Sequence, residues 1–342
     1  MAAAKALIAW LFCLGLAGLP QLSMAQASKA QSASAPAQPG PPLTVRSALL
    51  DLNPEQPGLS HLGSLTYLGG LVLASDDERF GGYSGLVVDA DGRGLWAISD
   101  LGHWLRLDFA LDGRGVPAAI RQARILPLRD AKGRQLERKH DADAESLRRS
   151  ADGHWLVGFE HWHRVWVYDE PGGPAMMALP LPPAATDQPA NGGVEAMAAL
   201  PQDGLLLFSE NLELADADGK LAGAAWLRRN GCWEERRWPK SGDFRPTDAT
   251  ALPNGDVVVL ERYFTVLVGP KARLRLIPAA AVNEARLEAT TLAEWARPVS
   301  IDNMEALDAR RAADGSAWLY VMSDDNRNGL QRTLLMVFRL GP

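Results

Sequence analysis

Carboxylates recur along the chain at both ends of a repeated hairpin pattern. The first acid of each pair opens an apolar run, the second closes the next apolar run, and a tight-turn signal lies between them. The pairs are Glu145 with Glu160, Glu195 with Glu210, Asp248 with Glu261, Glu305 with Asp324, and a first pair in which Ser84 stands opposite Asp100. The leading residues are 61, 50, 53 and 57 positions apart. This regular spacing indicates an internal repeat.

The repeat predicts that these side chains converge. In an antiparallel hairpin the start of the first strand lies beside the end of the second, so each pair falls at one end of its hairpin. Hairpins arranged around one axis would bring all pairs to one channel mouth. Such a ring of like charges needs bound cations, basic side chains or shared protons. Dense oxygen ligands favour Ca²⁺ over Zn²⁺. We therefore expect a Ca²⁺ site made by Asp100, Glu160, Glu210, Asp248, Glu261 and Asp324.

The leading glutamates should lie nearest the axis because they begin the innermost strands. This position makes Glu145, Glu195 and Glu305 the candidate catalytic acids and bases. The candidate substrate-binding residues are Arg262, Arg327 and Ser84. Arginine suits bidentate contact with phosphate or carboxylate groups. The structural alternatives are that the arginines only neutralise neighbouring acids and that the acids are solvated turn residues.

Two other chemistries are open from the sequence. Ser84 and His103 flank the same hairpin and could pair as nucleophile and base, although Gly82 to Leu86 departs from G-x-S-x-G at its last position. His161 and His163 could bind metal or transfer protons. Surface histidines beside aromatic residues are the alternative interpretation, and His140 is equally ambiguous.

The elements that position these residues are short strands. Asp-Gly or Asn-Gly turn signals lie between the two apolar runs of each repeat, and they are typical of hairpins. Third and fourth runs follow most hairpins, so each repeat resembles a blade of four antiparallel strands. We predict an all-β propeller of five to six blades. The last repeat lacks a fourth strand, and residues 65–74 are predicted to supply it and close the ring; the alternative fold is a β-sandwich with insertions.

Composition sets the domain boundaries and the expected location. Residues 1–25 have the order of a secretory signal peptide, and residues 26–43 form an Ala-, Ser-, Pro- and Gln-rich leader expected to be disordered. The propeller should span residues 44–342. The net charge of −6 and the lack of a basic cluster argue against nucleic-acid binding. We expect a periplasmic or secreted monomer that does not bind the membrane once the signal is cleaved.

Several motifs resemble those of the phytase-like domain family, often named "esterase-like activity of phytase". They are Phe80-Gly81-Gly82-Tyr83-Ser84-Gly85-Leu86, Ala144-Glu145-Ser146-Leu147, Gly193-Val194-Glu195-Ala196, Asp302-Asn303-Met304-Glu305-Ala306-Leu307 and Ser323-Asp324-Asp325-Asn326. The resemblance covers most of residues 60–340. It implies an exported β-propeller with phosphoester or ester hydrolase activity. The chain lacks the carboxylate-rich signature of alkaline β-propeller phytases, so the resemblance does not point to phytate.

These observations together predict a metal-assisted phosphoesterase or esterase. Its substrate would be a small anionic ester or phosphoester, bound at the acidic mouth. A non-catalytic propeller that binds a ligand or protein there is the alternative. A lactonase-type metal hydrolase with a similar acidic channel is a further one.

Overall fold

The computed structural model describes residues 40–216 and 218–341, and their strands form five antiparallel sheets. The predicted signal peptide and most of the predicted leader lie outside the described residues. Leu43, at the end of that leader, is buried against the first sheet, where its backbone N–H donates to the Ala123 carbonyl. Within the part of the chain that is described, no helix has the length and apolar character needed to cross a membrane.

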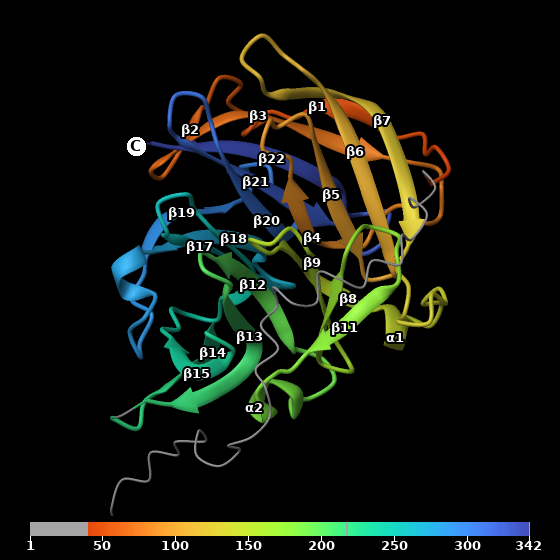
Figure 1. Cartoon of the computed structure of the whole chain (residues 1–342). Helices are drawn as coiled ribbons and strands as arrows, with labels where there is room; N and C mark the ends of the chain where they lie inside the picture. Colours follow the sequence, from red (N-terminus) through yellow and green to blue (C-terminus); the bar gives the residue numbers. More distant parts are fainter. Residues whose placement is uncertain (1–39, 217, 342) are drawn as a thin grey trace, which may run out of the picture. The chain divides into compact units, whose positions relative to one another are not determined.

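Each sheet is one blade (Figure 1), and in the first four blades the strands follow one another in chain order from the inside outward. Blade one is β4 (Tyr83–Val88), β5 (Gly94–Ser99), β6 (His103–Leu111) and β7 (Pro117–Pro127). Blade two is β8 (Ala144–Arg149), β9 (Trp155–Phe159), β10 (Arg164–Tyr168) and β11 (Ala175–Leu179). Blade three is β12 (Val194–Leu200), β13 (Gly204–Ala215), β14 (Leu221–Arg229) and β15 (Cys232–Trp238). Blade four is β16 (Arg245–Ala251), β17 (Val257–Thr265), β18 (Gly269–Ile277) and β19 (Thr290–Ala296).

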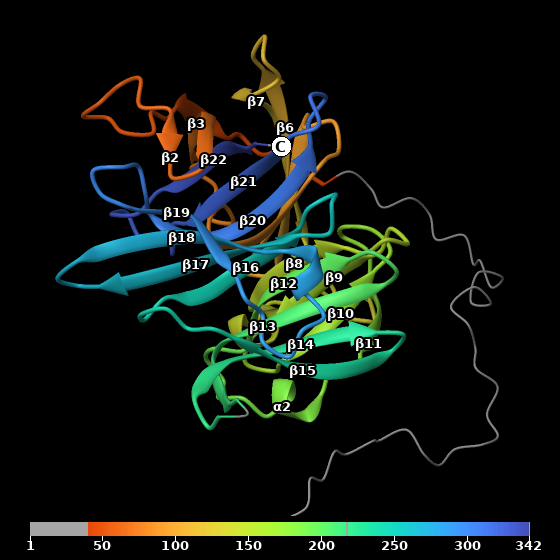
Figure 2. The ribbon, with the colours of Figure 1, turned by 90° about the vertical axis from the view of Figure 1, so that its left-hand side faces the viewer.

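The fifth blade joins the two ends of the propeller. It contains β20 (Asn303–Arg311), β21 (Ala317–Asp324), β22 (Thr333–Leu340) and then β3 (Leu65–Ala74) from the N-terminal side. Strands β22 and β3 pair antiparallel, with Leu335 opposite Leu71, and both views show them side by side (Figures 1 and 2). The predicted closure is therefore confirmed. Strands β1 (Arg46–Leu49) and β2 (His61–Leu62) pair with β3 and extend this blade, so the described residues form five blades and no sixth.

The connections contain little helix. Helix α1 (Lys139–Ala142) leads into blade two, helix α2 (Pro183–Thr186) leads into blade three, and a 3₁₀ turn (Ala279–Ala281) follows β18. Most of the predicted hairpin turns place a glycine at positive φ, as at Gly92 with φ 70°. In blade three the same turn instead places Gln202 and Asp203 at positive φ.

The hydrophobic core is divided among the five interfaces between neighbouring blades. Leu86 of blade one packs in the same cluster as Tyr320 of blade five, and Leu156 of blade two packs with Leu207 of blade three. Each of the other three interfaces has a corresponding cluster of buried apolar side chains. Every blade thus buries both faces, and its stability depends on its neighbours on either side.

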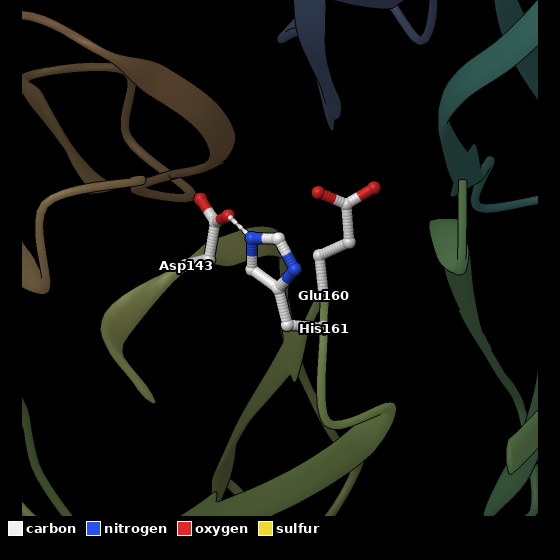
Figure 3. Close-up of side chains that lie close together, drawn as sticks. All are labelled: Asp143, Glu160 and His161. Atoms are coloured by element: carbon white, nitrogen blue, oxygen red, sulfur yellow. Dashed lines mark ion pairs between the residues drawn. The ribbon is translucent and has the colours of Figure 1, made fainter. Parts of the chain in front are cut away.

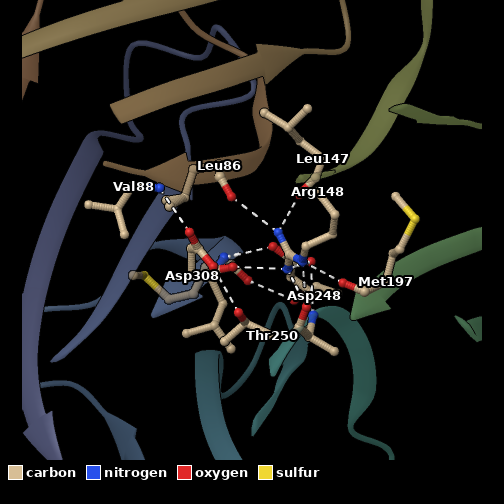
Figure 4. A network of polar contacts seen from close by, with 12 residues as sticks. Leu86, Val88, Leu147, Arg148, Met197, Asp248, Thr250 and Asp308 are labelled. Carbon is tan, nitrogen blue, oxygen red and sulfur yellow. Dashed lines mark hydrogen bonds and ion pairs between the residues drawn. The ribbon is translucent and has the colours of Figure 1, made fainter. Parts of the chain in front are cut away.

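The innermost strands β4, β8, β12, β16 and β20 contact one another in turn around the axis, and Arg148 of β8 fills the centre (Figure 4). This side chain is only 3% exposed. Its guanidinium donates to one main-chain carbonyl of every innermost strand: Leu86, Leu147, Met197, Ala249 and Leu307. It also forms an ion pair with Asp248, so its N–H groups meet six acceptors at one level of the axis.

Two aspartates complete this network. The Asp248 carboxylate also accepts hydrogen bonds from the backbone N–H groups of Ala249 and Leu307, both at 2.8 Å. Asp308 accepts from the backbone N–H of Val88 and from the Thr250 hydroxyl, each at 2.8 Å. These bonds tie blades one, four and five together.

Replacing Arg148 with Met should strongly destabilise the protein. The change leaves the buried Asp248 carboxylate without its counter-charge, and breaking a buried ion pair by removing one partner costs about 3–5 kcal/mol. The free energy of unfolding from urea titration measures this loss. The matched control is Arg149→Met, because Arg149 is the next residue of the same strand and is exposed. Equal stability of Arg148→Met and wild type would contradict the role of the network.

Candidate functional site

Each innermost strand carries a β-bulge at the same point, near its first residues. The register with the second strand shifts there by one residue in all five blades. The residues at the bulges are Ser84, Glu145, Glu195, Thr247 and Glu305. A bulge re-aims the side chain of its extra residue and bends the strand. The five bulges therefore present a matched set of side chains at one end of the axis.

The ends of the second strands supply a second matched set. Asp100, Glu160 and Glu210 donate their backbone N–H groups to Gly82, Asp143 and Gly193, just before the first strands. At the same place in blades four and five, Arg262 lies opposite Arg245 and Asp324 lies opposite Asn303. The set is therefore Asp100, Glu160, Glu210, Arg262 and Asp324.

We call the seven carboxylates among these ten positions the acidic ring: Glu145, Glu195, Glu305, Asp100, Glu160, Glu210 and Asp324. The negative charges of carboxylates from different blades lie close enough to raise one another's pKa values. Burial raises the pKa of Glu195, for example, and it is raised further by Glu210 of its own blade, Glu160 of blade two and Glu305 of blade five. These seven carboxylates therefore meet at one end of the axis, as the repeat predicts.

Blade four departs from the prediction by one residue in each strand. Thr247 occupies the bulge and Arg262 the partner position, so the expectation that Asp248 and Glu261 face the ring is wrong. Both carboxylates are fully buried. Asp248 pairs with Arg148, whereas Glu261 accepts hydrogen bonds from Trp238 at 2.9 Å and Arg273 at 2.7 Å. Both carboxylates therefore stabilise the interior of the fold and do not belong to the matched positions at the channel mouth.

Arg262 is the cation that blade four contributes to the ring. Its Nε lies 3.1 Å from Glu305 Oε1, and one terminal nitrogen lies 3.5 Å from Glu210 Oε1. The side chain remains 30% exposed. The pKa of Arg262 is raised, first by Glu305 and then by Glu210, Glu195 and Glu145. This residue compensates part of the negative charge and can still reach a ligand.

Four of the ring carboxyls have raised pKa values. Burial, with repulsion from Glu195 and other acids, raises the pKa of Glu145 well above its ordinary value, and burial likewise raises the pKa of Glu195. Burial raises the pKa of Glu305 to about 7, against the opposing effect of Arg262. Burial also raises the pKa of Asp324 to about 8. These raised pKa values allow ring carboxyls to hold protons near neutral pH, which suits general acid–base catalysis.

The remaining substrate-binding candidates lie beside the ring in different settings. Ser84 is buried at its bulge, and among the described residues no hydrogen bond joins it to His103. Arg327 is exposed in the loop after Asp324, where its backbone N–H donates to Asp325 at 2.9 Å. Within the described residues, Arg327 forms no ion pair with the acidic ring.

A mixed cluster of histidine and carboxylates lies where blade two meets the ring (Figure 3). It consists of Asp143, Glu160 and His161, and His161 Nε2 lies 3.0 Å from Asp143 Oδ2. Sequence analysis selected Glu160 and considered His161, but it missed Asp143, which precedes the predicted repeat. His163 does not join them, because it is buried with its Nε2 2.9 Å from the Pro189 carbonyl. Lys139 of α1 contacts Asp100 at 2.7 Å and Asp143 at 3.7 Å.

Comparison with solved structures finds several matches at low sequence identity. An α-L-arabinofuranosidase from Podospora anserina, in complex with cellotriose, is 13% identical, with 81% of this chain and 97% of that chain covered and a TM-score of 0.48. A Dyadobacter fermentans protein of unknown function is 13% identical, with 84% and 87% covered and a TM-score of 0.43. A virginiamycin B lyase from Staphylococcus aureus is 11% identical, with 86% and 100% covered and a TM-score of 0.40.

Sequence comparison is more specific. None of the curated proteins matches this chain. Residues 78–327 match the family described as "Phytase-like: Esterase-like activity of phytase", and this region runs from the loop before blade one through the acidic ring to the loop after Asp324. The chain therefore belongs to the phytase-like, esterase-like family and is a hydrolase-like β-propeller.

Proposed function

We propose that this protein is an exported, metal-assisted phosphoesterase or esterase whose active site is the acidic ring. The observation that carries the proposal is Arg262 set among carboxyls of raised pKa. The description of the family supports ester hydrolysis as the reaction class. Export rests on the predicted signal in residues 1–25.

The proposed substrate is a small anionic ester or phosphoester. Acids alone would repel such a substrate, so the ring must offer positive charge. Arg262 offers it directly, since a guanidinium binds carboxylate or phosphate oxygens in bidentate fashion. Protons held by Glu305 and Asp324 reduce the repulsion further.

The chemical step would use the ring carboxyls in two roles. An ionised glutamate accepts a proton from the attacking water, and a protonated neighbour donates a proton to the leaving oxygen. Glu145, Glu195 and Glu305 are the proposed acid–base residues because they project from the bulges.

A bound dication would supply Lewis-acid assistance and further positive charge. Ca²⁺ suits an all-oxygen donor set, and the candidates that lie in the ring are Asp100, Glu160, Glu210 and Asp324. Asp248 and Glu261 no longer belong to this set, because arginines and the protein interior satisfy them.

A non-catalytic binding propeller is the second candidate. The observation that favours it is the tip of the β17–β18 hairpin, which follows Arg262 along the chain. Val266 and Leu267 at this tip are 91% and 98% exposed. Exposed apolar groups of this kind mark binding surfaces in many proteins.

Replacing Glu195 or Glu305 with Gln should abolish most of the hydrolysis and leave the fold intact. Loss of a placed general acid or base lowers the rate by about 10²- to 10⁴-fold, whereas removing one charge relieves repulsion in the ring. Turnover is measured on phosphate esters, carboxyl esters and lactones with and without Ca²⁺. The control is Glu234→Gln, on the outermost strand of blade three. If wild type turns over none of these substrates but binds a ligand at the ring, the binding propeller takes the place of the enzyme.

Replacing Arg262 with Ala should weaken binding of anionic substrates. We expect KM to rise about tenfold or more with a smaller effect on kcat, because a charge-assisted hydrogen bond contributes about 1.5–3 kcal/mol. The matched control is Arg245→Ala, because Arg245 is exposed and lies opposite Arg262 on the neighbouring strand. An unchanged KM for anionic substrates in Arg262→Ala would exclude this residue from substrate binding.

The stability of the cation-free protein should decrease as pH rises. Glu305 and Asp324 have raised pKa values of about 7 and about 8, above their ordinary 4.5 and 3.8. The folded state therefore holds protons that the unfolded chain releases, and this stabilisation is lost as pH rises through the folded pKa values. We expect the melting temperature to fall between about pH 5 and about pH 8.

Calcium should offset this loss. Ca²⁺ competes with protons for the ring carboxylates, so its stabilisation should be larger at the higher pH, reaching about 2.7 kcal/mol at a hundredfold excess over its Kd. Thermal melts after chelation, across micromolar to millimolar Ca²⁺, measure both effects. If Ca²⁺ does not change the melting temperature at any pH, the proposed calcium site is wrong.

A further inference from the structure

Two carboxylates and one imidazole lie close together on blade two. A Ca²⁺ site made of oxygen ligands alone would not need the imidazole. One potential ligand atom each from Asp143, Glu160 and His161 lies within 4.8 Å of the others. They come from the two sides of one hairpin end, where the Glu160 backbone N–H donates to the Asp143 carbonyl at 2.9 Å. Figure 3 shows the imidazole between the two carboxylates.

The backbone at His161 is held in an uncommon conformation. Its φ is 59°, in the left-handed region that residues other than glycine seldom adopt. Such conformations persist only where the surroundings fix them, and they cluster at functional sites. Here the His161 N–H donates to the Ala190 carbonyl at 3.1 Å, and its ring stacks on His140 with centroids 5.1 Å apart. The imidazole is thus held rigidly toward Asp143.

Asp143 is not fully satisfied by the protein. Its side chain is 2% exposed, and its buried Oδ1 accepts no hydrogen bond from an N–H or hydroxyl group. The neighbouring Glu145 carboxyl can donate to Asp143 only when Glu145 itself holds a proton. The nearest cation to Oδ1 is Lys139 at 3.7 Å, and Lys139 makes its shorter contact with Asp100. A buried carboxylate with an unused oxygen has a strong need for positive charge.

We propose that Asp143, Glu160 and His161 bind a first-row transition-metal dication of the Zn²⁺ type. Imidazole nitrogen favours such ions, whereas Ca²⁺ prefers oxygen alone. Three protein ligands leave at least one coordination position open, which is the pattern of catalytic rather than structural zinc sites. The two carboxylates neutralise the ion, and Lys139 remains with Asp100.

This site goes beyond the proposed hydrolase and does not depend on it. Glu160 would be a ligand of this ion rather than of Ca²⁺, which leaves Asp100, Glu210 and Asp324 as the Ca²⁺ candidates. The alternative is an ordinary His161–Asp143 ion pair, with Glu160 held separately by its contact with the Gly192 backbone N–H. The chain offers a matched example of that alternative. His154 Nδ1 lies 2.9 Å from Asp152 Oδ2 at a hairpin turn, and this pair belongs to no three-ligand group in the described part of the chain.

Metal binding tests the proposal without reference to activity. The purified full chain is treated with chelator, desalted and titrated with Zn²⁺ by calorimetry, and with Co²⁺ while its visible absorption is recorded. We expect one equivalent of Zn²⁺ per chain, retained in millimolar Ca²⁺. The variants are His161→Asn, since asparagine tolerates positive φ, and Asp143→Asn. Each should weaken Zn²⁺ binding at least about tenfold and change the Co²⁺ spectrum. His154→Gln should bind as wild type does.

Melting curves of each variant confirm that it is folded, and Glu160→Gln provides a third test of the ligand set. Absence of stoichiometric Zn²⁺ binding, or equal affinity in wild type and His161→Asn, would overturn the proposal. Displacement of Zn²⁺ by equimolar Ca²⁺ would also overturn it. Hydrolysis that persists in a chain without a Zn²⁺ site would leave the proposed function standing and remove only this inference.

Discussion

The contact of Arg148 with all five innermost strands is the constraint on which the rest of the structure depends. A closed ring of strands directs main-chain carbonyls toward its axis, and these groups must be satisfied where water is excluded. One guanidinium meets five of them and an aspartate at a single level. Its planar fork of donors suits this task in a way that a lysine ammonium does not. The strands are thereby fixed at a common height, so their bulges also lie at a common height.

This shared height is what turns separate hairpin ends into one ring. Acids placed so close together repel, and the apolar interfaces between blades must hold them against that repulsion. The repulsion is reduced in two ways: Glu305 and Asp324 take up protons more readily than in water, and Arg262 replaces an acid. The stability of the fold and the reactivity of the ring therefore have the same origin.

The sequence predicts the repeats well because each hairpin has its own local signals. Apolar runs and turn residues are sufficient to assign five blades, and the missing fourth strand predicts the pairing of β22 with β3. The error in blade four has a physical cause. Asp248 and Glu261 fit the acidic pattern but stand one residue away from the ring positions, which Thr247 and Arg262 occupy, and their role is to neutralise the buried Arg148 and Arg273. Arg148, Asp143 and the orientation of His161 depend on contacts among different blades or loops, which no local pattern contains.

The five blades do not contribute the same groups to the ring, so its charge differs from one side to the other. Four blades place an acid at the second-strand position, and only blade four places a cation there. Blade two carries the cluster with the imidazole, and blade three, with Glu195 and Glu210, lies between it and Arg262. A symmetric ring of acids would attract cations without orienting an anion. With Arg262 on one side and a dication held on the other, an anionic group would be drawn to a path that crosses the glutamates of blade three. Glu195, one of the proposed acid–base residues, lies on that path, and Arg262 is the cation whose charge acts on it.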